Sequence, residues 1–139
     1  MKIKFDFVTN SSSTCFVIIL KKGQKFTEEQ FMDCVGVNDK SPVYNIFESL
    51  FEMFASNMNP FDSAVSTHRW NKGGLWDSFI KDVFSDDLVN RIRLAKELGD
   101  SLYFGTLSSD IDDLETFFCC DSFRIEGKNI FIDATNSSW

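Results

Sequence analysis

Six consecutive apolar residues, CFVIIL at positions 15–20, constrain the fold of this chain more than any other segment. Successive side chains of a strand point to opposite faces of a sheet, so an unbroken apolar run of this length predicts a strand buried on both faces. Lys21, Lys22 and Gly23 follow it and predict a turn at the surface. We therefore expect a central strand with apolar cover on both sides.

Further strands are predicted near both ends of the chain. Residues 2–7 (KIKFDF) alternate polar and apolar side chains, which is typical of a half-buried strand. Residues 101–107 are predicted to form another strand, and FRIEGKNIFI at 123–132 a hairpin connected at 126–129. These segments predict a mainly antiparallel sheet built from N-terminal and C-terminal strands.

The first helix has the clearest sequence boundaries. Thr27 and Gln30 form a capping box, and Phe26 and Phe31 occupy the two positions of a hydrophobic staple. Such a combination fixes the start of a helix by local contacts alone. The helix is therefore expected to begin at Thr27 and to end near Gly36.

A second helix is expected after the loop at 38–42, with Pro42 in its first turn. Its apolar positions recur at a spacing near 3.6, so one face should pack across the core. This stripe comprises Val43, Ile46, Phe47, Leu50, Phe51 and Phe54. Residues 56–74 lose all periodicity and are predicted to be the longest loop.

Three more helices are predicted in the second half of the chain. One covers about 75–84, and the next runs from a cap at Ser85 to Leu98, with Gly99 as its C-terminal cap. Another is expected after Ser108 and Ser109, with an inner face formed by Ile111, Leu114, Phe117 and Phe118.

The length and composition fit a single domain. A chain of 139 residues with 43% apolar residues and 16 phenylalanines can bury one sizeable core, which excludes the disordered classes. With strands and helices segregated along the chain, we expect one α+β domain over residues 1–139, its antiparallel sheet packed against about five helices.

The charge of the chain bears on its partners. The formal net charge is −7, and residues 1–30 carry five lysines and three acids, so the imbalance lies in the rest of the chain. An acidic surface repels nucleic acid and favours a partner with a basic surface. No apolar stretch is long enough for a membrane helix, no signal peptide is recognisable, and the four cysteines are expected to be free thiols, so a cytoplasmic protein is predicted.

Small polar residues precede the central strand. They are Thr9, Asn10, Ser11, Ser12, Ser13 and Thr14. A hairpin connection between the first two strands explains them, because hydroxyl side chains can satisfy the amides of a turn. The alternative is an anion or nucleotide site, since successive hydroxyls and amides can converge on one point. Glycine and lysine, which phosphate loops use, are missing from this segment.

His68, Arg69 and Trp70 lie together in the predicted long loop. Exposed tryptophan and arginine are frequent anchors of protein interfaces, so these residues are candidates for partner binding. Burial of Trp70 under the loop is the alternative. His68 is the only imidazole in the chain, and nothing in the spacing selects it for a catalytic triad.

Four acidic residues, Asp110, Asp112, Asp113 and Glu115, form the densest acidic cluster. Their position at a predicted helix start fits the helix macrodipole. They are also candidates for binding a basic partner, and a divalent cation held by Asp110, Asp112 and Glu115 in a metal-dependent hydrolase is a further alternative. The spacing matches no calcium loop, and the four cysteines and one histidine match no zinc motif. We therefore expect no metal and no cofactor, and the sequence favours a protein that is not an enzyme.

The segment FDFVTNSSSTCFVI at 5–18 resembles an N-terminal signature, FVTNSSSSSF, of short proteins from bacteria, archaea and their phages. Thr14 and Cys15 stand where serines are usual. The segments YFGTLSSD at 103–110 and FRIEGKNIFID at 123–133 are similar to the C-terminal part of such proteins. The resemblance implies a microbial or phage origin and one sheet built from both ends of the chain, and it implies no activity.

The leading functional hypothesis is an acidic interaction protein that binds and modulates a protein partner. A phage or mobile-element inhibitor of a host nucleic-acid-binding enzyme would suit this charge, because acidic surfaces can occupy a basic groove. The alternative hypothesis is a small anion-binding or nucleotide-binding domain that uses the loop at 9–14.

Overall fold

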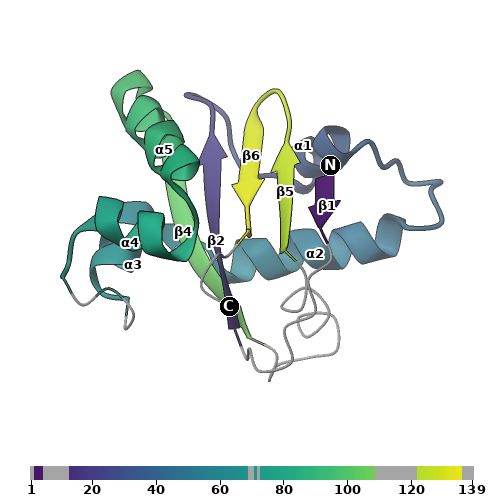
Figure 1. Cartoon of the computed structure of the whole chain (residues 1–139). Helices are drawn as coiled ribbons and strands as arrows, with labels where there is room; N and C mark the ends of the chain where they lie inside the picture. The colour runs from purple at the N-terminus through teal and green to yellow at the C-terminus, as the bar shows by residue number, and fades with distance from the viewer. Residues whose placement is uncertain (1, 5–12, 69–70, 72, 109–121, 136–139) are drawn as a thin grey trace.

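The computed structural model describes residues 2–4, 13–68, 71, 73–108 and 122–135, and the chain forms three layers (Figure 1). A sheet in strand order β1-β5-β6-β2-β4-β3 forms the middle layer, and all of its pairs are antiparallel. The strands are β1 (Lys2–Lys4), β2 (Ser13–Leu20), β3 (Asn59–Pro60), β4 (Ser101–Ser108), β5 (Ser122–Glu126) and β6 (Ile130–Asp133). The predicted α+β class is confirmed.

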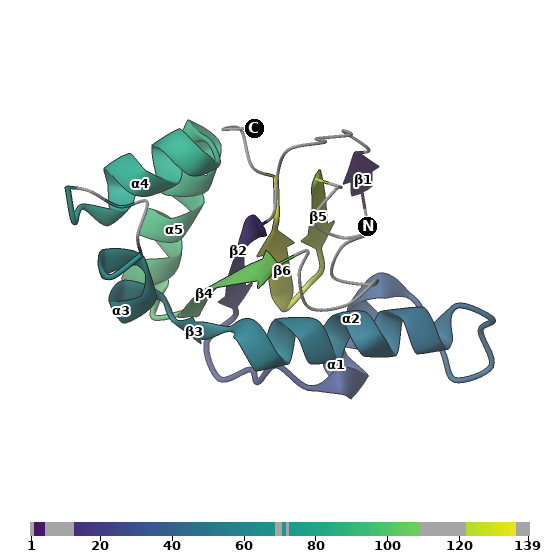
Figure 2. The same ribbon diagram turned by 90° about the horizontal axis from the view of Figure 1, so that it is seen from below.

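Helices cover both faces of the sheet. Figure 2 shows α3, α4 and α5 on one side, and α1 and α2 on the other. Their bounds are α1 (Glu28–Val35), α2 (Tyr44–Asn57), α3 (Phe61–Ser66), α4 (Trp76–Val83) and α5 (Asp86–Leu98).

Strand β2 is the centre of the sheet, as predicted. It pairs with β4 along its whole length, from Ser13 opposite Ser108 to Leu20 opposite Ser101, and with β6 on its other edge. Cys15, Val17 and Ile19 face the core shared with α3, α4 and α5. The alternate side chains, Phe16, Ile18 and Leu20, face the core shared with α1 and α2.

The helix ends follow the local signals in the sequence. Thr27 caps α1, since its hydroxyl accepts a hydrogen bond from the amide of Gln30 at 3.2 Å, and Gly36 ends the helix at a φ of 75°. The second half of the capping box is absent, because Oε1 of Gln30 accepts no hydrogen bond from the described residues, while its Nε2 donates to Oε1 of Gln24. Ser85 caps α5 in the same way, and Gly99 ends it at a φ of 78°.

Helix α2 differs from the prediction at its start. It begins at Tyr44 with Val43 as the N-cap, so Pro42 precedes the helix and does not lie in its first turn. Leu50 and Phe54 are buried as expected, but the side chains of Val43 and Ile46 are 40% and 49% exposed. The predicted apolar stripe is therefore only partly used by the core.

The predicted loop at 56–74 is wrong at 56–57, which belong to the end of α2, and at 59–66, which form β3 and α3. Phe61 and Val65 lie one helical turn apart in α3 and are both buried against the sheet. A helix of six residues leaves only these two strongly apolar positions, which is too few to produce a visible periodicity.

The predicted hairpin between the first two strands is also wrong. Strands β1 and β2 are not neighbours, since β5 and β6 lie between them, and β1 pairs with β5 instead. The N-terminal and C-terminal strands do share one sheet, as expected. The helix predicted after Ser108 and Ser109 falls within 109–121, outside the described residues.

Gly105 in β4 allows a close approach that positions the end of α2. A Cβ atom at this residue would lie 2.3 Å from the carbonyl oxygen of Asn57 and 2.4 Å from Cζ of Phe16. Both neighbours belong to packed elements, so neither has room to move. The glycine therefore lets the helix end and the ring of Phe16 meet over the strand.

Gly105→Ala is expected to lower the free energy of unfolding by about 2–3 kcal/mol, because the added methyl group overpacks this contact. Urea denaturation measures the change. Gly73→Ala is the control, since a Cβ there meets no atom within 4 Å, and its effect should stay within about 0.5 kcal/mol. Equal effects of the two substitutions would contradict this role of Gly105.

Candidate functional site

The structure describes three of the residues predicted to form sites: Ser13, Thr14 and His68. The others lie outside the described residues, so their predicted roles stay predictions. They are Thr9, Asn10, Ser11, Ser12, Arg69, Trp70, Asp110, Asp112, Asp113 and Glu115.

Ser13 and Thr14 belong to β2 and not to a loop. Thr14 lies opposite Leu107 of β4, and its side chain is buried. A buried hydroxyl in the middle layer of the fold is not presented to a ligand in solution. Thr14 is therefore unsuited to the anion site that the sequence left open.

His68 follows α3 and is half-buried against the sheet. Its ring packs between those of Phe79 and Phe104, with ring centroids 5.3 and 5.4 Å away. Its Nε2 atom lies 3.5 Å from Oγ1 of Thr106 and 3.9 Å from Sγ of Cys15. The imidazole thus joins α3 to two strands of the sheet.

The proximity of Cys15 and His68 is the combination that activates a catalytic thiol in many enzymes. Cys15 is 0% exposed, however, so a substrate has no access to its sulfur. The described residues also contain no group of three His, Cys, Asp or Glu side chains that could hold a metal ion. The geometry favours a packing role for this thiol.

A polar pocket of about 710 Å³ opens beside His68. The end of α2, strand β3, helix α3 and strand β4 contribute to its wall. We call it the His68 pocket, and its polar side chains include Asn57, Asn59, Ser63, Thr67, His68 and Thr106. Its volume is typical of small-molecule sites.

A second candidate surface lies on α1 and α2, where carboxylates crowd together. A hydrogen bond with Glu28, burial and the charges of Glu28 and Glu52 together raise the pKa of Glu48. Burial, followed by the charges of Glu28 and Glu48, raises the pKa of Tyr44, whose hydroxyl donates to Oε1 of Glu28 at 3.4 Å. We call Glu28, Asp39, Tyr44, Glu48 and Glu52 the acidic α1–α2 face.

The opposite side of the molecule holds paired charges. Among the described residues, the ion pairs involve Arg91, Arg93, Lys96 and Arg124, of which the first three belong to α5. None of them involves a carboxylate of the acidic α1–α2 face. The described surface is therefore electrostatically compensated on one side and uncompensated on the other.

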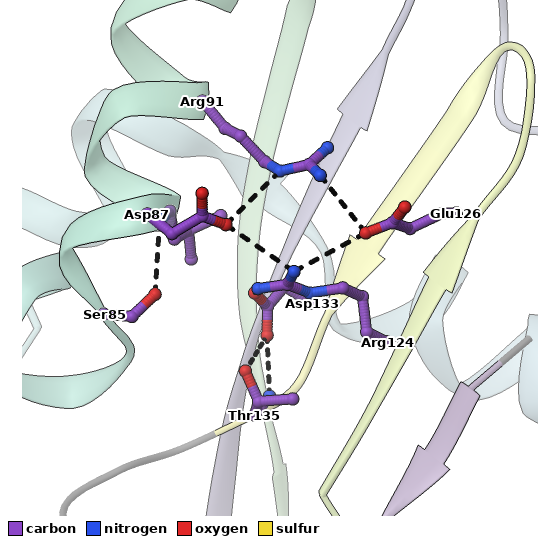
Figure 3. A network of polar contacts seen from close by, with 8 residues as sticks. Ser85, Asp87, Arg91, Arg124, Glu126, Asp133 and Thr135 are labelled. Atoms are coloured by element: carbon purple, nitrogen blue, oxygen red, sulfur yellow. Dashed lines mark hydrogen bonds and ion pairs between the residues drawn. The ribbon is translucent and has the colours of Figure 1, made fainter.

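The most extensive group of ion pairs ties α5 to the β5–β6 hairpin (Figure 3). Arg124 lies opposite Asp133 in the strand register and donates to its Oδ2 at 2.9 Å. Asp133 is 0% exposed, and its other oxygen accepts from the amide and the hydroxyl of Thr135. Arg124 also lies near Asp87 of α5, so the buried pair reaches the helical layer.

Two more side chains complete this network. Arg91 of α5 pairs with Asp87 and with Glu126 of β5, and its guanidinium lies 4.4 Å from the ring centroid of Phe131. Burial of the guanidinium lowers the pKa of Arg124, but the surrounding carboxylates, Asp133 first, more than offset this and raise it above its ordinary value. The network therefore joins α5 to the β5–β6 hairpin and has a structural role.

Sequence reasoning found neither the acidic α1–α2 face nor this network. Glu48 and Glu52 are one turn apart in the sequence, but their proximity to Glu28 depends on how two helices pack. The predicted connection at 126–129 would place Arg124 opposite Phe131. In the structure β5 includes Glu126 and Arg124 lies opposite Asp133, so the predicted hairpin register was wrong by two residues. The contact with α5 is long-range and leaves no sequence signal.

The chain matches no family model, no curated protein and no solved structure in the comparisons with known proteins. The resemblance of its N-terminal segment to the FVTNSSSSSF signature therefore stays a prediction. No helix within the described ranges has both the length and the apolar character needed to cross a membrane.

Arg124→Gln is expected to lower the free energy of unfolding by about 3 kcal/mol, because it leaves the carboxylate of Asp133 buried without its cationic partner. Thermal and urea denaturation measure this loss. Arg93→Gln is the matched control, since Arg93 forms a surface pair with Asp77. Such pairs contribute less than about 1 kcal/mol. Similar losses in both variants would refute the structural role of the buried pair.

Glu48→Gln is expected to raise the melting temperature at neutral pH. The raised pKa means that the folded state binds this proton more tightly than the unfolded state does. The stability that this group contributes is therefore present below the ordinary pKa of glutamate and is lost as the pH rises through the raised value. Melting curves from acidic to neutral pH should show the gain of the variant disappearing in acid.

The control for this substitution is Glu97→Gln, which neutralises an exposed glutamate of α5 that has no ion pair among the described residues. Its melting temperature should change little at any pH. A gain of equal size in both variants would show that relief of net charge, and not crowding at Glu48, is the cause.

Proposed function

We propose that this protein binds a partner protein with a basic surface through the acidic α1–α2 face and acts without catalysing a reaction. The observation that carries the proposal is the crowding of carboxylates around Glu48, none of which forms an ion pair among the described residues. The helix dipole favours Glu28 in the first turn of α1, but the proximity of like charges around Glu48 destabilises the free protein.

The distribution of charge along the chain supports this surface. Residues 28–52, which include α1 and most of α2, hold six acidic side chains and one lysine, a net charge of −5. The whole chain has a net charge of −7. Residues 109–121 also have a net charge of −5, with five acidic side chains and no basic one, so this pair of helices is one of two acidic concentrations in the chain. Such a concentration speeds the association with an oppositely charged partner.

Two exposed apolar residues lie at the start of α2. Val43 and Ile46, at the start of α2, are 40% and 49% exposed, although their spacing suits a buried stripe. Interfaces between proteins commonly combine an apolar centre with a charged rim. At about 100° per residue, Val43 and Ile46 lie on the side of α2 away from Glu48, so they extend the candidate interface around the start of the helix.

The partner would carry lysine and arginine side chains near Glu28 and Glu48, where a cation relieves the repulsion between them. Proteins that bind nucleic acid present such basic grooves. We propose in particular that the protein is an inhibitor from a phage or mobile element that occupies the basic groove of a host nucleic-acid-binding enzyme. Its charge and the resemblance of its N-terminal segment support this narrower proposal.

Affinity capture tests the proposal. Tagged protein should recover a stoichiometric partner from a lysate of the cells in which it acts, and Glu52→Lys should weaken the measured affinity about tenfold, equivalent to about 1.4 kcal/mol. Raising the salt concentration should weaken the wild-type complex, because screening reduces the attraction between opposite charges.

The matched control is Glu97→Lys, which makes the same change of charge at an exposed position of α5, away from the acidic α1–α2 face. Its affinity should stay within about twofold of wild type. Failure to recover a partner, or equal weakening by both substitutions, would overturn the proposal.

A further inference from the structure

The His68 pocket is a second site, and its hydrogen-bonding groups indicate what it binds. It lies at the C-terminal end of α2, whereas the acidic α1–α2 face includes the start of that helix. The pocket is open to solvent and has a volume of about 710 Å³. Its chemistry follows from the donors and acceptors of its wall.

The two asparagines of the wall direct their amide nitrogens to the backbone. Nδ2 of Asn57 donates to the carbonyl of Met53 at 2.7 Å, and Nδ2 of Asn59 donates to the carbonyl of Asn57 at 3.1 Å. Their Oδ1 atoms accept no hydrogen bond from the described residues. Each asparagine thus keeps its Oδ1 acceptor, together with one N–H of Nδ2, for a ligand.

The two hydroxyls contributed by α3 and its C-cap behave in the same way. Oγ of Ser63 donates to the carbonyl of Pro60 at 3.2 Å, and Oγ1 of Thr67 donates to the carbonyl of Ser63 at 2.8 Å. A hydroxyl has one donor and two acceptor positions. These groups therefore meet a ligand as acceptors, which disfavours an anion such as phosphate.

The C-terminal ends of two helices add negative electrostatic potential to the His68 pocket. The pocket borders the C-terminal turns of α2 and α3, where the carbonyl groups of a helix concentrate partial negative charge. Neither helix has a basic residue in its last turn, and no lysine or arginine among the described residues lines the pocket. The net charge of −7 of the whole chain also favours a positively charged ligand.

We propose that the His68 pocket binds a primary ammonium group, which carries a positive charge and three N–H donors. The group would lie among the oxygens of Asn57, Asn59 and Thr67, close to the imidazole of His68. A lysine side chain of a polypeptide and a free polyamine both carry such a group.

Proton NMR of the single imidazole tests this site, since His68 is the only histidine of the chain. At about pH 8, where a typical imidazole is neutral, n-butylammonium should shift the Hε1 resonance of His68 saturably at millimolar concentrations. Tetramethylammonium, which has the charge but no N–H, and n-butanol, which lacks the charge, should not. Equal responses to the two cations, or no response to n-butylammonium, would overturn the proposal.

A pair of substitutions separates the pocket from general charge effects. Thr67→Lys places a tethered ammonium in the pocket and should abolish the response to n-butylammonium. Ser66→Lys adds the same charge next to it, at a residue that also donates to the carbonyl of Ser63 but does not line the pocket, and it should keep the response. Loss of the response in both variants would contradict the site.

Asn59→Asp provides a test in which the substitution is expected to strengthen the binding of n-butylammonium to the His68 pocket. A carboxylate beside the ammonium should tighten n-butylammonium binding several-fold, and unchanged or weaker binding would count against the site.

A comparison of Nα-acetyl-lysine methylamide with spermidine then identifies the source of the ammonium group. Tighter binding of the first supports a lysine of a polypeptide, tighter binding of the second supports a polyamine, and binding of neither overturns the proposal.

Discussion

The burial of β2 on both faces is the constraint on which the rest of this structure depends. Its six apolar residues at 15–20 supply one core to α1 and α2 and another to α3, α4 and α5. A strand of this kind is stable only when both helical layers are in place, because removing either layer exposes three apolar side chains of β2 to water. The close approach at Gly105 follows from the same constraint, since Phe16 of β2 and the end of α2 meet over β4.

The two helical layers differ in whether their charged side chains form ion pairs, and the proposed function depends on this difference. On the α5 side, Arg91 and Arg124 hold Asp87, Glu126 and the buried Asp133 in a network that joins helix and hairpin. On the other side, the carboxylates around Glu48 have no such partners among the described residues. The ion pairs among the described residues therefore gather on the α5 side, and none of them reaches the carboxylates around Glu48.

Much of the fold could be predicted from the sequence because its signals are local. Thr27 and Ser85 cap helices with their own hydroxyls, Gly36 and Gly99 end them with positive φ angles, and CFVIIL is a buried strand in any context that can cover it. Features that depend on long-range contacts were missed. The separation of β1 from β2 depends on the hairpin that inserts between them, and α3 is too short to show a period. Of the candidate sites, His68 could be singled out as the only imidazole, but its contacts with Cys15 and Thr106 join segments far apart in the chain.

Native-state hydrogen exchange tests most directly whether β2 joins the two helical layers into one cooperative unit. The slowest amides of β2, of α2 and of α5 are predicted to exchange with opening free energies that agree within about 1 kcal/mol, because neither layer is stable without the strand. Amides of α1 and α2 that open several kcal/mol more easily than those of β2 and α5 would show that one layer unfolds alone, and would contradict the central role assigned to this strand.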